Sequence, residues 1–243
     1  MGRTNKITRL FIIIQVVLYL GFLHLDLIGG YYVVSSYIKY FIIILCLLYT
    51  FINYDRTRKC RSYCLILGLI FTIIADYYLL LLGYNFEYGI GAFIIVQQIY
   101  GSMLDYSSRP LFGNVLKRFL LQLSITFIIA LLLYILDFKI ELIVVLSIFY
   151  FISILMNTFR AIKVSIKYKD DRSNILFAIG MILFVLCDIN VGLFNLSYYL
   201  DISVAMATAI IRVSSLMMWL FYAPSQILIA LSSGSIGTMH KIP

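Results

Sequence analysis

Three ionisable side chains interrupt long apolar stretches of this 243-residue chain: Asp76, Asp188 and Arg212. A charge inside such a stretch is costly, and it usually marks function. Two carboxyl groups in one low-dielectric site cannot both ionise easily, so the pair would hold one proton between them. A proton donor then stands beside a base, as general acid–base chemistry requires. These residues indicate hydrolysis of an ether- or acetal-like bond or a proton relay in a transporter, and we expect no metal or cofactor.

Other polar side chains fall at helical spacing in the same apolar stretches. A purely structural ion pair with Arg212 would need only one aspartate, so the second carboxyl group favours function. Scattered serines and tyrosines more often hold helices together. The five polar residues that we expect to bind substrate or to support the site are Gln97, Tyr100, Asn157, Tyr222 and Gln226.

The composition determines which elements carry these residues. The chain is 63% hydrophobic and 12% charged, whereas soluble domains are about 45–50% apolar and about 25% charged. Crossing a membrane takes about 20 apolar residues. We therefore expect an all-α integral membrane protein, forming one transmembrane domain over residues 1–243. Its eight expected spans are 7–28, 32–52, 63–82, 88–104, 119–136, 140–162, 175–196 and 204–231.

Basic residues predict the orientation of these spans. They gather before the first span and within 56–61, 109–118 and 163–172, whereas the intervening loops carry almost none. Cytoplasmic loops are the basic ones, so both termini are expected inside. Short clusters between apolar runs also argue against nucleic acid as a partner of this chain, despite its net charge of +8. A helix rises about 1.5 Å per residue, so the depth of a residue in the membrane can be counted from the end of its span. This count places four residues at one expected depth: Asp76, Asp188, Arg212 and Gln97.

The two aspartates also suggest an internal repeat. Asp76 and Asp188 lie 112 residues apart, and Gly68 and Gly180 match at the same offset. Both aspartates occupy spans that run in the same direction. This pattern favours a parallel four-plus-four duplication with a site between the halves.

Several segments resemble the YhhN-type lysoplasmalogenase family. Residues 75–80 read Ala-Asp-Tyr-Tyr-Leu-Leu, similar to the family's Gly-Asp-x-x-Leu, and residues 97–100 read Gln-Gln-Ile-Tyr, similar to its Ala-His-x-x-Tyr pattern. A Cys-Asp pair at 187–188 resembles the family's Ser-Asp, and Arg212 follows. Residues 221–226 resemble a Thr-Tyr-x-x-Ala-Gln pattern. Ala75 replaces the usual glycine and Gln97 the usual histidine, and glutamine cannot titrate.

The resemblance implies hydrolysis of the vinyl ether bond of lysoplasmalogens to a fatty aldehyde and a glycerophospho-base. It implies Asp76 and Asp188 as the catalytic residues, with Arg212 balancing their charge or contacting the substrate phosphate. The expected partners are a lysophospholipid and membrane lipids, and the expected location is a bacterial cytoplasmic membrane. A small proton-coupled transporter and an inactive lipid-binding homologue remain the alternatives.

Overall fold

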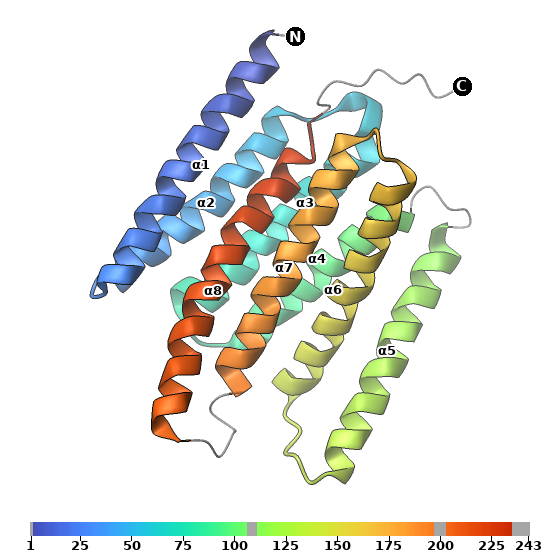
Figure 1. The fold of residues 1–243 in the computed structure, drawn as a ribbon. Helices are drawn as coiled ribbons and strands as arrows, with labels where there is room; N and C mark the ends of the chain where they lie inside the picture. The colour runs from blue at the N-terminus through green and yellow to red at the C-terminus, as the bar shows by residue number, and fades with distance from the viewer. Residues whose placement is uncertain (1, 106–110, 197–202, 235–243) are drawn as a thin grey trace.

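The computed structural model describes residues 2–105, 111–196 and 203–234. In these ranges the chain is all-helical, with eight long helices and no strand (Figure 1). The helices are α1 (Gly2–Ile28), α2 (Tyr32–Ile52), α3 (Lys59–Asp76), α4 (Phe86–Asp105), α5 (Leu111–Ile135), α6 (Leu142–Lys167), α7 (Arg172–Leu196) and α8 (Val204–Leu231). A 3₁₀ turn, η1 (Arg56–Arg58), precedes α3, and a π-helical segment, η2 (Tyr77–Leu82), follows it.

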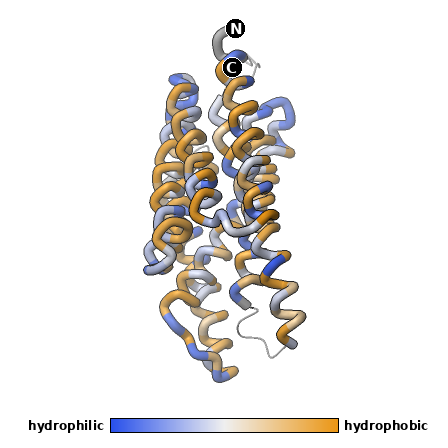
Figure 2. The backbone as a smooth tube through the Cα atoms, turned by 90° about the vertical axis from the view of Figure 1, so that its left-hand side faces the viewer, coloured by the Kyte–Doolittle hydropathy of each residue, from blue (hydrophilic) through white to orange (hydrophobic). Residues whose placement is uncertain are grey.

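Seven of the helices in the described ranges are long and apolar enough to cross a membrane. Hydrophobic residues dominate their length (Figure 2). The exception is α4, expected as the fourth and shortest span, whose hydropathy is lowered by Glu87, Gln97, Gln98 and Asp105. Because α4 packs against α3, α5 and α6, it can bury its polar side chains against protein instead of lipid. The chain is therefore an integral membrane protein, and α4 is the described long helix that is not apolar enough to cross a membrane by composition alone.

Six helices form a closed ring, which explains why the interior can be polar. Around the ring, α2 packs against α3, α3 against α4, α4 against α6, α6 against α7, α7 against α8, and α8 against α2. Helix α1 packs outside the ring against α2 and α8, and α5 packs outside it against α4 and α6. The start of α1 and the end of α8 lie at the same end of the bundle (Figure 1). Which side of the membrane that end faces, and whether the halves are a repeat, remain predictions.

The basic cluster within 109–118, expected in the fourth loop, differs from its expected place. Helix α5 begins at Leu111, eight residues before the expected start of the span, so Lys117 and Arg118 are helical. Arg118 is buried, because its guanidinium forms an ion pair with Asp105 of α4. A neutralised charge of this kind no longer marks the end of a span. Arg109, from the same cluster, lies outside the described residues.

The third expected span is a composite of two helix types. Its α-helical part ends at Asp76, and the next six residues continue as the π-helix η2, which stops at Gly83 with φ 68°. Insertions of π-helix often accompany functional sites. A Cβ on Gly89 of α4 would lie 2.5 Å from Leu79 Cγ, so this glycine lets α4 approach η2 closely. The change of helix type thus falls directly after one of the two candidate catalytic residues.

Candidate functional site

Asp76, the last residue of α3, faces the inside of the ring. Its carboxyl group accepts hydrogen bonds from the Tyr222 hydroxyl of α8, at 2.8 Å to Oδ1 and 2.8 Å to Oδ2. Asp76 is only 4% exposed, and Tyr222 is buried as well. A carboxyl group at this depth needs such a partner, because lipid and apolar side chains offer it no hydrogen bonds.

Asp188 of α7 has a tyrosine partner of its own. The Tyr150 hydroxyl of α6 donates a hydrogen bond of 2.7 Å to Asp188 Oδ2. Asp188 is half-buried, in contrast to Asp76. Asp76 follows the start of α3 by 17 residues and Asp188 follows the start of α7 by 16, so both lie about 25 Å from one end of the bundle. The carboxyl groups therefore occupy one layer, and Asp188 is the more accessible of the two.

Aromatic rings join the two tyrosine–aspartate pairs. The Phe93 ring of α4 lies 5.7 Å from the Tyr150 ring and 6.4 Å from the Tyr222 ring. Phe184 of α7 lies 5.6 Å from both Phe93 and Tyr222. Within the described residues each carboxyl group bonds to its own tyrosine and the two do not bond to each other. Five ring helices thus converge on the site.

Arg212 does not join the carboxyl groups as the sequence predicts. It is exposed, and none of the ion pairs among the described residues includes it. The reason is geometric. Ten residues at about 100° each place Arg212 about 80° around α8 from Tyr222, and the first ten residues of α8 are largely exposed. The charge of the aspartates is therefore not balanced by direct contact with Arg212.

Gln97 and Asn157, two of the expected supporting residues, contact each other. Asn157 Nδ2 of α6 donates to the Gln97 backbone oxygen of α4 at 2.7 Å and to Gln97 Oε1 at 3.1 Å. Both side chains are fully buried. Glutamine at position 97 thus keeps a hydrogen-bonding role between α4 and α6.

Tyr100 and Gln226 are buried but do not hydrogen-bond to either aspartate. The Tyr100 ring lies edge-on to Phe177 at 5.5 Å and closely over Gly68 of α3. Gln226 Nε2 donates to the Ser225 hydroxyl at 3.4 Å. Of the five expected supporting residues, only Tyr222 binds a carboxyl group directly.

Sequence reasoning missed two features of the site. Tyr150 belongs to a polar stripe on α6 but was not expected to bind Asp188. Lys39 of α2 forms a buried ion pair of 2.8 Å with Asp26 of α1, and its Nζ lies 4.4 Å from the Trp219 ring centre. Trp219 in turn lies 5.5 Å from Tyr222. Lys39 is a charged residue within an expected apolar span, and this feature of the sequence could have identified Lys39 as a candidate site residue.

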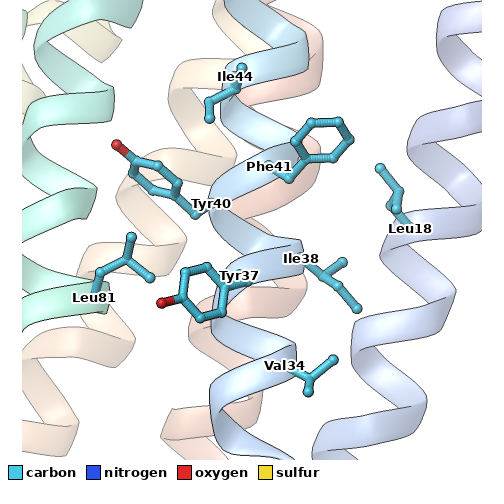
Figure 3. A pocket seen from close by; sticks show the side chains of 8 residues that line it. All are labelled: Leu18, Val34, Tyr37, Ile38, Tyr40, Phe41, Ile44 and Leu81. Carbon is cyan, nitrogen blue, oxygen red and sulfur yellow. The ribbon is translucent and has the colours of Figure 1, made fainter.

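A pocket of about 560 Å³ lies over α2 (Figure 3). Figure 3 shows α2 in the centre, with Leu18 of α1 on one side and Leu81 of η2 on the other. The lining is apolar apart from two tyrosine hydroxyls. Its residues are Leu18, Val34, Tyr37, Ile38, Tyr40, Phe41, Ile44 and Leu81. Leu81 belongs to η2, the segment that directly follows Asp76, so one side of the pocket lies near the end of α3.

The fold and the site together define a helical membrane protein whose ring interior holds two tyrosine-bound carboxyl groups. The model of the YhhN family matches residues 34–233, which include both aspartates and both tyrosines. The chain belongs to the YhhN family. Comparison with curated proteins gives no match, and comparison with solved structures gives none either.

Proposed function

We propose that this protein hydrolyses the vinyl ether bond of lysoplasmalogens, releasing a fatty aldehyde and a glycerophospho-base, in a bacterial cytoplasmic membrane. The observation that carries the proposal is the pair of carboxyl groups in the ring interior, each bound by a tyrosine hydroxyl. Membership of the YhhN family supports it. Cleavage of a vinyl ether needs a proton donor and a base but no nucleophilic side chain.

The hydrogen bonds support different roles for the two aspartates. Both oxygens of Asp76 accept from Tyr222, which suits an ionised carboxylate. Asp188 accepts from Tyr150 through Oδ2, which leaves Oδ1 available to carry a proton. Asp188 is also the more exposed of the two, so substrate reaches it more easily. We therefore take Asp188 as the acid and Asp76 as the base.

The reaction then proceeds through an oxocarbenium ion. Asp188 delivers its proton to the alkenyl carbon that does not bear oxygen, and positive charge develops across the neighbouring carbon–oxygen bond. Ionised Asp76 stabilises that charge. It then takes a proton from the water molecule that adds to the carbon, which gives a hemiacetal. The hemiacetal then gives its hydroxyl proton to the ionised Asp188, its bond to the glycerol oxygen breaks, and that oxygen takes up the proton held by Asp76. Overall, one water molecule is consumed and both aspartates return to their starting states.

The remaining features fit the two ends of such a substrate. Arg212 is exposed, and a guanidinium binds phosphate well. The pocket over α2 is apolar, which suits a hydrocarbon chain. We therefore propose that Arg212 contacts the phosphate and that the pocket holds the chain.

The test is an assay of the purified protein in detergent, with vinyl-ether and ester lysophospholipids side by side. Aldehyde release from the vinyl ether alone is expected. Asp76→Asn and Asp188→Asn should each abolish it while the protein remains folded. Asp137→Asn is the matched control, because Asp137 is an exposed residue with φ 58°, a conformation that asparagine tolerates. Full activity in both site variants would refute the mechanism.

A proton-coupled transporter is the second candidate, favoured by the ion cluster Asp105–Arg118–Arg160. Transport requires sealed vesicles and a gradient, whereas hydrolysis proceeds in detergent. Lipid binding without aldehyde release would instead indicate an inactive homologue.

A further inference from the structure

One face of α6 carries a line of polar side chains along much of the helix. Tyr150, Ser153, Asn157 and Arg160 follow one another at steps of three, four and three residues, so they share a face. Tyr150 is the residue that binds Asp188. Ten residues separate the ends of the line, which is about 15 Å at 1.5 Å per residue. The line therefore runs from the candidate site toward the end of the bundle where α6 terminates.

Polar side chains of α4 and α5 face this line. Gln98 Nε2 of α4 donates to Gln122 Oε1 of α5 at 2.9 Å and to the Ser153 hydroxyl at 3.4 Å. Arg118 of α5 donates to Gln98 Oε1 at 3.4 Å and to the Ser102 hydroxyl at 3.4 Å. We call this contact region of α4, α5 and α6 the polar seam.

An ion cluster closes the far end of the polar seam. Asp105 of α4 pairs with Arg118 at 2.5 Å and also with Arg160. The Arg118 side chain is buried, whereas the Arg160 side chain is 27% exposed. A Cβ on Gly101 would lie 2.8 Å from Asn157 Oδ1 and against the Arg118 guanidinium. The side chains of α5 and α6 thus meet over Gly101, where the polar seam joins the cluster.

Four buried polar atoms of the polar seam have no hydrogen-bond partner among the described residues. They are Gln97 Nε2, Asn157 Oδ1, Gln122 Nε2 and Arg118 Nε. Buried polar groups almost always have a protein or water partner, and one without a partner is costly at membrane depth. Exchanging the amide oxygen and nitrogen of Asn157 does not help, because its nitrogen already serves both oxygens of Gln97. Four such atoms in one contact region indicate a common ligand with both donors and acceptors.

We propose that the polar seam holds a file of water molecules that joins the Tyr150–Asp188 hydrogen bond to the Asp105–Arg118–Arg160 cluster. Water supplies donors and acceptors together, and buried water commonly serves otherwise unpaired groups. Arg160, the partly exposed residue at the far end, gives the file its contact with solvent. The existence of the file does not depend on the proposed function. If that function is correct, the file supplies the water that each hydrolysis consumes.

The test measures how fast silver ions, which move with water, react with a cysteine placed in the polar seam. All variants are made in a parent protein that carries Cys60→Ser and Cys64→Ser. The rate at which silver reacts with the remaining Cys46 and Cys187 of this parent is measured separately and subtracted. Ser153→Cys is the probe, and Gln122→Cys serves if that variant does not fold. Ile154→Cys is the buried apolar control at the same depth, and Leu121→Cys, where leucine is 50% exposed, is the control outside the bundle. Thiols left unreacted are counted by maleimide labelling after denaturation.

A hydrated polar seam predicts that the probe reacts at least about tenfold faster than both controls. Adding Gly101→Ala, whose methyl group would enter the meeting point of Arg118 and Asn157, should slow the probe severalfold. A probe as slow as Ile154→Cys would overturn the proposal. A fast probe that Gly101→Ala leaves unchanged would overturn the connection to the ion cluster. Because no substrate is present, failure of the lysoplasmalogenase assay does not affect this result.

Discussion

Replacing Tyr222 with phenylalanine removes one hydroxyl group from a buried site and leaves the ring in place. That hydroxyl donates to both oxygens of Asp76 at 2.8 Å. A hydrogen bond to a charged group is worth about 1.5–3 kcal/mol. Asp76 is 4% exposed, so solvent cannot replace the lost donor. We therefore expect Tyr222→Phe to lower the free energy of unfolding by about 1.5–3 kcal/mol.

The same variant should slow hydrolysis if Asp76 acts as the base. A tenfold change in rate corresponds to about 1.4 kcal/mol, so the lost hydrogen bond corresponds to a decrease in kcat of about 10- to 150-fold. Aldehyde release in detergent and thermal unfolding are measured on the same preparation. Tyr49→Phe is the matched control, because its hydroxyl is 3.0 Å from Thr8 Oγ1 and bonds to neither aspartate.

Comparison with Tyr150→Phe tests the reasoning from burial. Asp188 is half-buried, so water can partly replace Tyr150. The loss of stability should then be smaller than for Tyr222→Phe, about 0.5–1.5 kcal/mol. If Tyr222→Phe unfolds at the wild-type temperature and retains full activity, the hydroxyl contributes nothing to the site and the assignment of Asp76 fails.

Three further predictions concern packing and charge. Gly68→Ala should lower the free energy of unfolding by about 1–3 kcal/mol, because its methyl group would meet the rigid Tyr100 ring. Thermal unfolding measures this loss. Gly91→Ala is the control and should not lower the free energy of unfolding, because no atom lies within 4 Å of the added methyl group. Asp105→Asn should lower the free energy of unfolding by about 3–5 kcal/mol, because it leaves Arg118 and Arg160 without the carboxylate that balances their charge. An unchanged midpoint of denaturation would contradict this prediction. Lys39→Met should lower the free energy of unfolding, because it leaves Asp26 without its cation. Adding Asp26→Leu should restore part of the lost free energy. Additive losses in the double variant would show that the two charges are not coupled.

The order of the helices was largely predictable from hydropathy. The bounds of α2 and α8 coincide with the expected ranges 32–52 and 204–231. Helix α5 begins earlier than expected because the pairing of Arg118 with Asp105 allows a basic residue inside the helix. A sequence pattern treats each charge as exposed, and it cannot show that Asp105 on the preceding helix neutralises Arg118.

The partners of the site residues were not predictable in the same way. Tyr222 is separated from Asp76 by 146 residues, and nothing in the local sequence of either residue identifies the other. Arg212 and Tyr222 belong to the same predicted span, but the packing of α8 buries Tyr222 and leaves Arg212 exposed. Periodicity gives the direction of a side chain around its own helix, whereas the neighbours in that direction depend on how the helices pack.

The sequence alone determined that the chain enters a membrane as helices, that it resembles the YhhN family, and that two aspartates interrupt its apolar stretches. Each of these conclusions follows from local properties, since hydropathy and helical hydrogen bonding depend on residues close together in the chain. Only the tertiary structure decided that Tyr222 and Tyr150 bind the aspartates and that Arg212 does not. Contacts between distant segments arise when the ring closes, because closure brings α3 beside α2 and α4, and α8 beside α7 and α2.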